Sequence, residues 1–172
     1  MKTSIENIVS VLPLFFISIP CIKLFYNILF SISIKNLLLY ISGIIITTTS
    51  IQMFKQLPYP SYLYKYTMRP EGAYGCDYFS SKGLCRKNTP GMPSGHMGTT
   101  AFFIIYNYLY ITQHYPAHYL HYKLPRITLF TLFTGLLIIM GWARYKKKCH
   151  NIWQIIIGSI YGGFMGYVFY LI

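Results

Sequence analysis

The chain has 172 residues, of which 54% are hydrophobic and only 10% are charged. Soluble domains usually carry about 25% charged residues, so this composition argues against a water-soluble protein and favours one embedded in lipid. The net charge of +12 would suggest nucleic acid as the partner of a soluble protein. Here the basic residues lie mainly between hydrophobic runs, so anionic lipid headgroups or a phosphorylated ligand are the expected partners, and nucleic acid is not.

Five apolar segments follow one another along the chain, over about residues 8–34, 37–54, 97–111, 129–142 and 152–172. Backbone polar groups inside a bilayer must be satisfied within the protein, so we expect these spans to be helices. The third and fourth are short for a crossing of about 30 Å and need flanking residues to complete it. We predict an all-α, polytopic membrane helix bundle of five transmembrane helices, or six if the first segment is a re-entrant pair.

The first segment has the charge pattern of a signal peptide, with Lys2 ahead of an apolar core. It lacks a convincing small-x-small cleavage site, so we expect it to be retained as the first span. Nothing along the chain resembles a linker or a low-complexity tail. Residues 1–172 are therefore expected to form a single membrane-embedded domain.

The longest polar segment, residues 55–95, joins the second and third spans. A loop of this length in a small chain is more often functional than a simple connection. With five spans, parity places this loop, the start of the third span and the connection between the fourth and fifth spans at the same membrane face. The polar residues of these three regions are therefore expected to converge.

Several groups at that face are suited to binding an anion. Ser94 and Gly95 stand directly before a helical run, where a hydroxyl cap and exposed backbone N–H groups attract negative charge. Arg69 and Arg144 offer bidentate forks that match phosphate oxygens, and Lys65 adds a point charge.

Two histidines, His96 and His150, stand at the N-terminal ends of two different predicted helices at this face. One imidazole can attack phosphorus while the other protonates the departing oxygen, with the cations holding the remaining phosphate oxygens. The set therefore indicates phosphoryl transfer. A capping or interfacial role is the alternative for each histidine taken alone.

Together these residues resemble the type-2 phosphatidic acid phosphatase superfamily, the lipid phosphate phosphatases. That family carries a Lys six residues ahead of an Arg-Pro pair, then Pro-Ser-Gly-His, then Ser-Arg, five residues, His, three residues and Asp. The resemblance covers about residues 55–172. This chain shows Arg69-Pro70, the whole of Pro93-Ser94-Gly95-His96, and Arg144 followed after five residues by His150.

The resemblance implies a metal-independent membrane phosphatase that needs no cofactor. Its substrate would be a lipid phosphate, such as phosphatidic acid, or a polyprenyl pyrophosphate. His150 would be the nucleophile that forms a phosphohistidine, and His96 the general acid. The residues implied to bind the phosphate are Lys65, Arg69, Ser94, Gly95 and Arg144.

Three positions depart from the family pattern. Tyr62 occupies the position of the motif lysine, with Lys65 three residues further on, and Ala143 replaces the Ser before Arg144. Gln154 stands where the family has the Asp that orients the nucleophile. Its amide oxygen, i+4 on a helix, can accept a hydrogen bond from the histidine but supplies no negative charge. A catalytically impaired member that acts as a non-enzymatic anionic-lipid-binding or structural membrane protein is the alternative.

Two further features of this face concern its surroundings. Cys76 and Cys85 share one polar loop and either form a disulfide in an oxidising compartment or stay as thiols. The lysine run 146–148 is expected to be a solvated topological anchor without a catalytic role. The excess of Lys and Arg at this face predicts a cytosolic location, whereas the family resemblance implies a luminal or external one.

Overall fold

A computed structural model describes residues 34–73, 76, 89–114 and 126–172. This part of the chain is helical and contains α2 (Ile34–Lys55), η1 (Ser61–Leu63), α3 (Tyr64–Thr67), α4 (Gly95–His114), α5 (Arg126–Lys146) and α6 (Ile152–Leu171). The all-α bundle predicted from the sequence is confirmed. Residues 8–33 of the first predicted span lie outside the described residues.

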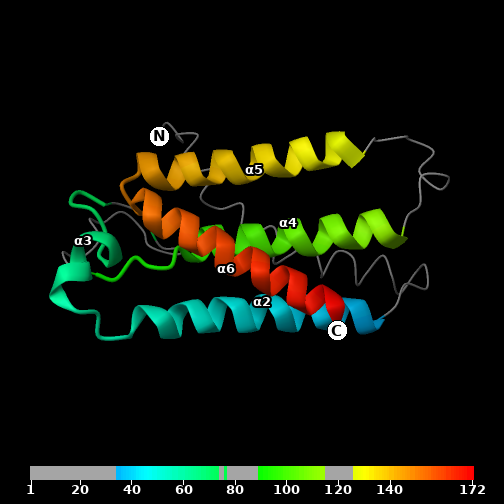
Figure 1. The fold of residues 1–172 in the computed structure, drawn as a ribbon, viewed down its shortest axis with the longest axis horizontal. Helices are drawn as coiled ribbons and strands as arrows, with labels where there is room; N and C mark the ends of the chain where they lie inside the picture. The colour runs from blue at the N-terminus through cyan, green and yellow to red at the C-terminus, as the bar shows by residue number, and fades with distance from the viewer. Residues whose placement is uncertain (1–33, 74–75, 77–88, 115–125) are drawn as a thin grey trace, which may run out of the picture.

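The four long helices lie beside one another as a bundle and alternate in direction (Figure 1). Three of the helices in the described part, α2, α5 and α6, are long and apolar enough to cross a membrane. The helices of the third and fourth predicted spans are longer than their apolar runs, because flanking residues extend both of them. The protein is therefore an integral membrane protein.

The helix α4 packs against α2, α5 and α6, most extensively against α6. Figure 1 shows α6 crossing in front of α4, with α2 and α5 on either side. Polar side chains on α4, among them Thr99, Thr100 and Asn107, are buried against its neighbours. A helix that faces other helices needs less apolar surface than one that faces lipid, which is consistent with the absence of α4 from the described helices that are apolar enough to cross a membrane.

Close packing between α4 and α6 depends on glycines spaced four residues apart on α6. A β-carbon on Gly158 would lie 2.6 Å from the carbonyl oxygen of Ser94, and one on Gly166 would lie 2.7 Å from that of Phe102. At Gly162 a β-carbon would overlap the backbone of Gly98. Small residues at this spacing let two helix backbones approach closely, which is how membrane helices associate without a hydrophobic driving force.

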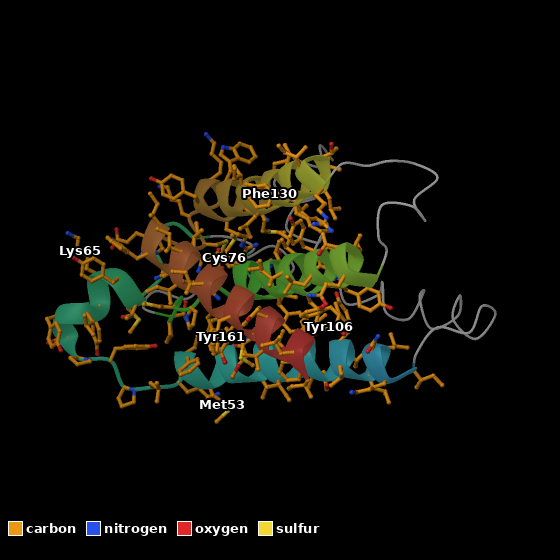
Figure 2. All side chains as sticks on the ribbon, turned by 45° about the vertical axis from the view of Figure 1, so that its right-hand side comes forward. Met53, Lys65, Cys76, Tyr106, Phe130 and Tyr161 are labelled. Atoms are coloured by element: carbon orange, nitrogen blue, oxygen red, sulfur yellow. A yellow bond between two sulfur atoms is a disulfide. The ribbon has the colours of Figure 1, made fainter. Side chains whose placement is uncertain are left out.

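The bundle has an aromatic end and a polar end. Tyr40, Phe102, Tyr106 and Phe169 form a buried cluster between α2, α4 and α6. At the opposite end, which we call the loop end, α2 finishes, α4 begins, and the turn from α5 to α6 lies close to α3 (Figure 1). In Figure 2, Lys65 of α3 marks the loop end, and Tyr106 lies further along the bundle. The convergence predicted from parity is confirmed for these elements.

Candidate active site

Two loop segments pair beside α3 and bring the Arg-Pro motif next to the start of α4. The N–H of Arg69 donates to the carbonyl of Thr89 at 3.0 Å, and the N–H of Gly91 donates to that of Thr67 at 2.8 Å. Met68 and Pro90 form an isolated antiparallel bridge between these bonds. Residues twenty or more positions apart in the chain are thereby held side by side.

The turn between α5 and α6 carries the second pair of motif residues. The N–H of Cys149 donates to the carbonyl of Arg144 at 3.1 Å, and Lys148 takes a left-handed conformation with φ of 55°. The turn reverses the chain so that Arg144 and His150 are both enclosed, with exposed fractions of 0% and 2%. A buried guanidinium and a buried imidazole of this kind are typical of a functional site rather than of a membrane-facing turn.

Helix α6 begins with a capping box that includes Gln154. The side chain of Asn151 accepts a hydrogen bond from the N–H of Gln154 at 2.9 Å, and the Oε1 of Gln154 accepts one from the N–H of Asn151 at 3.2 Å. The Nδ2 of Asn151 also donates to the carbonyl of Tyr66 at 3.1 Å. The cap therefore fixes the start of α6 and attaches it to α3.

The amide of Gln154 determines which nitrogen of His150 carries the proton. Its Nε2 donates to the carbonyls of Tyr66 and Met68 at 2.9 and 2.8 Å, so the opposite atom, Oε1, must face the imidazole. The distance from Oε1 to Nδ1 of His150 is 3.2 Å. Because a carbonyl oxygen can only accept, Nδ1 is the protonated nitrogen and Nε2 of the neutral ring keeps its lone pair.

The surroundings of His150 favour the neutral imidazole. Burial is the largest cause that lowers the pKa of His150 well below its ordinary value of about 6.5. The positive charges of Arg144, Lys55 and Arg69 lower this pKa further, and the hydrogen bond with Gln154 acts in the opposite direction. At neutral pH the ring is therefore uncharged.

The loop between α3 and α4 contacts Arg144 through Cys76. The Nη2 of Arg144 donates a short hydrogen bond to the carbonyl oxygen of Cys76. Cys76 also forms a disulfide with Cys149, with 5.3 Å between their Cα atoms. Both alternatives considered for Cys76, a bridge to Cys85 or a free thiol, are therefore wrong, because the fold brings Cys149 and not a neighbour in the sequence to Cys76.

The start of α4 lies against the start of α6. The backbone N–H of Ser94 donates to the carbonyl of Gln154 at 3.1 Å, and the Oγ of Ser94 is 3.5 Å from the N–H of Met97, as for a helix cap. His96, in the first turn, is 5% exposed. The helix start that carries Ser94, Gly95 and His96 is thus attached directly to the residue that contacts His150.

Lys55 is a cation of this cluster that the sequence motifs did not single out. Its Nζ lies 3.9 Å from the position that a β-carbon on Gly95 would occupy, and its charge acts on His150. Lys65 is placed differently, because it is exposed and its Nζ lies 6.0 Å from the ring centroid of Tyr66. Its backbone carbonyl, 3.3 Å from the Nδ2 of Asn151, is the part of Lys65 that contacts the α6 cap. In the sequence, the only indication that Lys55 belongs to this cluster was its position at the end of the second span.

Two other residues of the site were missed or misread. A β-carbon on Gly91 would lie 2.6 Å from the Oε1 of Gln154 and 3.0 Å from the Cγ of Arg69, so only glycine leaves room for both side chains. Lys147 is 3% exposed, so the expectation of a solvated lysine run is wrong for this residue, while Lys146 and Lys148 are exposed. The turn buries the side chain of Lys147, and a run of three lysines in the sequence does not indicate which of them is buried.

Comparison with known families matched the chain to the PAP2 superfamily over residues 33–172. The match covers all the helices of the described part and every residue of the cluster at the loop end. Comparisons with curated proteins and with solved structures each gave no match.

Proposed function

Because the chain belongs to the PAP2 superfamily, whose members are phosphatases, we propose that it hydrolyses the phosphate ester or pyrophosphate of a lipid through a phosphohistidine intermediate. The observation that carries the proposal is the contact of Gln154 Oε1 with Nδ1 of His150, 3.2 Å apart, beside three cationic side chains. This contact leaves Nε2 as an oriented, neutral nucleophile among groups that attract phosphate.

In the first step, Nε2 of His150 attacks phosphorus and the bond from phosphorus to the leaving oxygen breaks. That oxygen takes a proton from His96 and departs, and the imidazole of His96 is then neutral. In the second step, His96 removes a proton from water as the water attacks the phosphohistidine, and the P–N bond breaks to release inorganic phosphate. Each histidine ends in its starting state.

The charge of the transferring group is balanced by cations of the protein. Arg69 and Arg144 present forks to the equatorial oxygens, and Lys55 adds a third positive charge close to Gly95. The backbone N–H groups at the start of α4 complete the cradle with Ser94. Such a set provides the electrostatic stabilisation that a metal ion supplies in other phosphatases, so we propose that the reaction is metal-independent.

Gln154 orients His150 without a negative charge. In a serine protease triad, the change of Asp to Asn costs about 10⁴ in rate, largely because the wrong tautomer is held. Here Nε2 of Gln154 is held by two carbonyls, so Oε1 faces the ring and supports the productive tautomer. We therefore propose an active but slower enzyme than one with an aspartate at this position.

A lipid substrate is supported by an apolar groove next to the cluster. The groove, of about 470 Å³, runs between α5 and α6 and is lined at the loop end by Met97, which follows His96, and by Ile152, two residues after His150. Apolar walls that lead to a few convergent polar groups are typical of a site for an amphiphilic ligand. We propose that the acyl or prenyl chain of the substrate lies in this groove.

The compartment of the loop end is supported by the disulfide. Disulfides persist in oxidising compartments and are rare in the cytosol. The bond between Cys76 and Cys149 lies at the loop end, so we propose that the catalytic face is luminal or external. The phosphate-binding cations raise the Lys and Arg count at this face, which explains why counting basic residues favours the opposite orientation.

The proposal is tested with protein purified in detergent in the presence of EDTA. Phosphatidic acid and a polyprenyl pyrophosphate are offered as substrates, and released phosphate is measured for the parent, His150→Ala and Lys146→Ala. Lys146 is an exposed cation at the end of α5, directly before the same turn, and serves as the matched control. We expect His150→Ala to lower kcat by at least about 10³-fold and Lys146→Ala to change it less than about twofold.

A second readout concerns the covalent intermediate. Acid-labile, base-stable phosphate should be trapped on the parent after rapid mixing with radiolabelled substrate, and not on His150→Ala. Phosphate release from neither substrate, with anionic-lipid binding that survives His150→Ala, would overturn the proposal and indicate a lipid-binding protein instead.

A further inference from the structure

The disulfide between Cys76 and Cys149 lies inside the catalytic cluster. Cys149 is fully buried, Cys76 is 2% exposed, and both pack with Ala73 in a small buried cluster. Cys149 directly precedes His150, so one peptide bond separates the covalent link from the nucleophile. Figure 2 labels Cys76 apart from Tyr106 of the aromatic end.

Cys76 contacts both parts of the Arg-x5-His motif, directly at Arg144 and through Cys149 at His150. The carbonyl of Cys76 accepts a hydrogen bond from the guanidinium of Arg144, and its sulfur is bonded to Cys149. The N–H of Cys149 in turn donates to the carbonyl of Arg144 at 3.1 Å. These contacts close a ring that runs from the Arg144 side chain through Cys76 and Cys149 back to the Arg144 backbone.

We propose that the Cys76–Cys149 disulfide is a positioning element for catalysis, which sets the guanidinium of Arg144 and the imidazole of His150 at the spacing that one phosphoryl group requires. The inference rests on the proposed function of these two side chains. His150 lies in the non-helical stretch between α5 and α6, so no helical ladder fixes its backbone. The Asn151 cap holds the backbone that follows His150, and the disulfide at Cys149 holds the backbone that precedes it.

The hydrogen bond with Gln154 does not replace this constraint. It sets the rotation and tautomer of the His150 ring, whereas the position of the ring depends on its Cα. Arg144 is anchored on α5 and has a long side chain whose end is held by the Cys76 carbonyl. Without the disulfide, no cross-link joins Cys76, whose carbonyl holds Arg144, to the turn that carries His150. A displacement of about 1 Å at reacting groups costs about 10²-fold in rate.

The bundle itself does not depend on this link. Gly162 and Gly166 of α6 pack against Gly98 and Phe102 of α4, and the aromatic cluster joins α2, α4 and α6, and none of these contacts includes Cys76 or Cys149. Loss of the disulfide is therefore expected to affect turnover more than folding. A larger effect on turnover than on folding distinguishes a disulfide that positions catalytic groups from one that only stabilises the fold.

The primary test compares Cys76→Ala, Cys149→Ala and the double variant with the parent and with Cys85→Ala, a cysteine of the same loop, as control. Peptide mapping without reductant first establishes the Cys76–Cys149 link in the parent and in the control. We then expect kcat to fall about 10- to 100-fold in each single variant, with KM changed less than about threefold. Because one bond is removed in every case, the double variant should lose no more than either single variant.

Three results would overturn the inference: absence of the cross-linked peptide, losses that add in the double variant, or a lowered unfolding temperature with unchanged kcat at 25 °C. Reduction by dithiothreitol followed by reoxidation with oxidised glutathione is the second arm, and activity should be lost and then recovered. The Cys85→Ala control should follow the parent in both steps.

Failure of the proposed function gives a different pattern, because an oxidised parent that hydrolyses neither substrate overturns the phosphatase proposal itself. In that case orthovanadate, a phosphate-like anion, is used as the probe, and its affinity is measured by thermal shift. We expect the same non-additive loss of vanadate affinity in the cysteine variants. Unchanged affinity would overturn the positioning role independently of turnover.

Discussion

The side-chain amide of Gln154 links three parts of the site at once. Its oxygen contacts Nδ1 of His150 and the N–H of Asn151, and its nitrogen donates to two carbonyls beside α3. An amide can satisfy all of these partners because it is both donor and acceptor, which a carboxylate is not. A glutamine at this position therefore supplies N–H donors to the carbonyls of Tyr66 and Met68, which a carboxylate could not do.

Replacing this amide by an apolar side chain of similar length tests its orienting role. We expect Gln154→Met to lower kcat by about 10²-fold or more, because Nδ1 loses the acceptor that fixes the tautomer. The carbonyls of Tyr66 and Met68 lose their donors, which should cost about 2 kcal/mol of stability. Turnover and thermal unfolding in detergent measure the two effects. Gln113→Met, at an exposed position of α4, is the control, and an equal loss there would contradict the orienting role.

The lowered pKa of His150 predicts how stability depends on pH. The unfolded chain protonates this histidine near pH 6.5, whereas the folded chain keeps it neutral to lower pH. The unfolded state therefore binds more protons as pH falls below about 6.5, so the free energy of unfolding should decrease from there downwards until the folded-state pKa is reached. Unfolding temperatures between pH 7.5 and 4.5 measure this.

His150→Ala is the comparison for the pH series, because it removes the titrating group. Its unfolding temperature should fall less between pH 7.5 and 4.5 than that of the parent. Equal slopes in the two proteins would show that His150 is not buried as a neutral ring.

At the scale of elements, the contact between α4 and α6 positions the site as well as the bundle. Ser94 at the start of α4 is hydrogen-bonded to Gln154 on α6, so a change in the separation of these helices moves the proposed phosphate-binding residues relative to His150. The glycines at 158, 162 and 166 set this separation. Their spacing of four is visible in the sequence, and it is the signal by which this contact could have been found.

A single methyl group at the closest of these glycines should separate the two helices. We expect Gly162→Ala to destabilise the protein by about 1–3 kcal/mol, because its β-carbon would overlap the backbone of Gly98, which cannot yield as a side chain can. Gly163→Ala is the matched control, because its β-carbon would meet only the Ile105 side chain at 3.6 Å. Unfolding titrations in mixed detergent measure both, and equal stabilities would contradict the close approach.

At the scale of the whole molecule, the orientation proposed for the loop end can be read from labelling. Tyr62→Cys places a thiol at an exposed position of the loop end, and Lys35→Cys places one at the exposed start of α2, at the other end. In sealed vesicles of known sidedness, a membrane-impermeant maleimide on the luminal or external side should label the first and spare the second until detergent is added. The reverse pattern would place the loop end in the cytosol and contradict a persistent disulfide there.

The helices, their alternation and the gathering of motifs at one end were predictable from the sequence. Long uncharged runs have few stable forms in a membrane, and the parity of helical crossings then assigns each loop to a face. For the same reason, Arg69, Ser94, Arg144 and His150 could be expected at one face from their positions beside these runs. The family match adds weight to the motifs over most of this length.

The identities of the contacts were decided by tertiary structure alone. Lys55, rather than the exposed Lys65, lies by the start of α4, and Cys149, rather than Cys85, is bonded to Cys76. Both depend on how the ends of the helices pack together, and on the direction in which each side chain leaves its backbone. Periodicity and spacing specify elements and faces, whereas distances of a few ångströms between residues remote in the chain arise only when the helices pack.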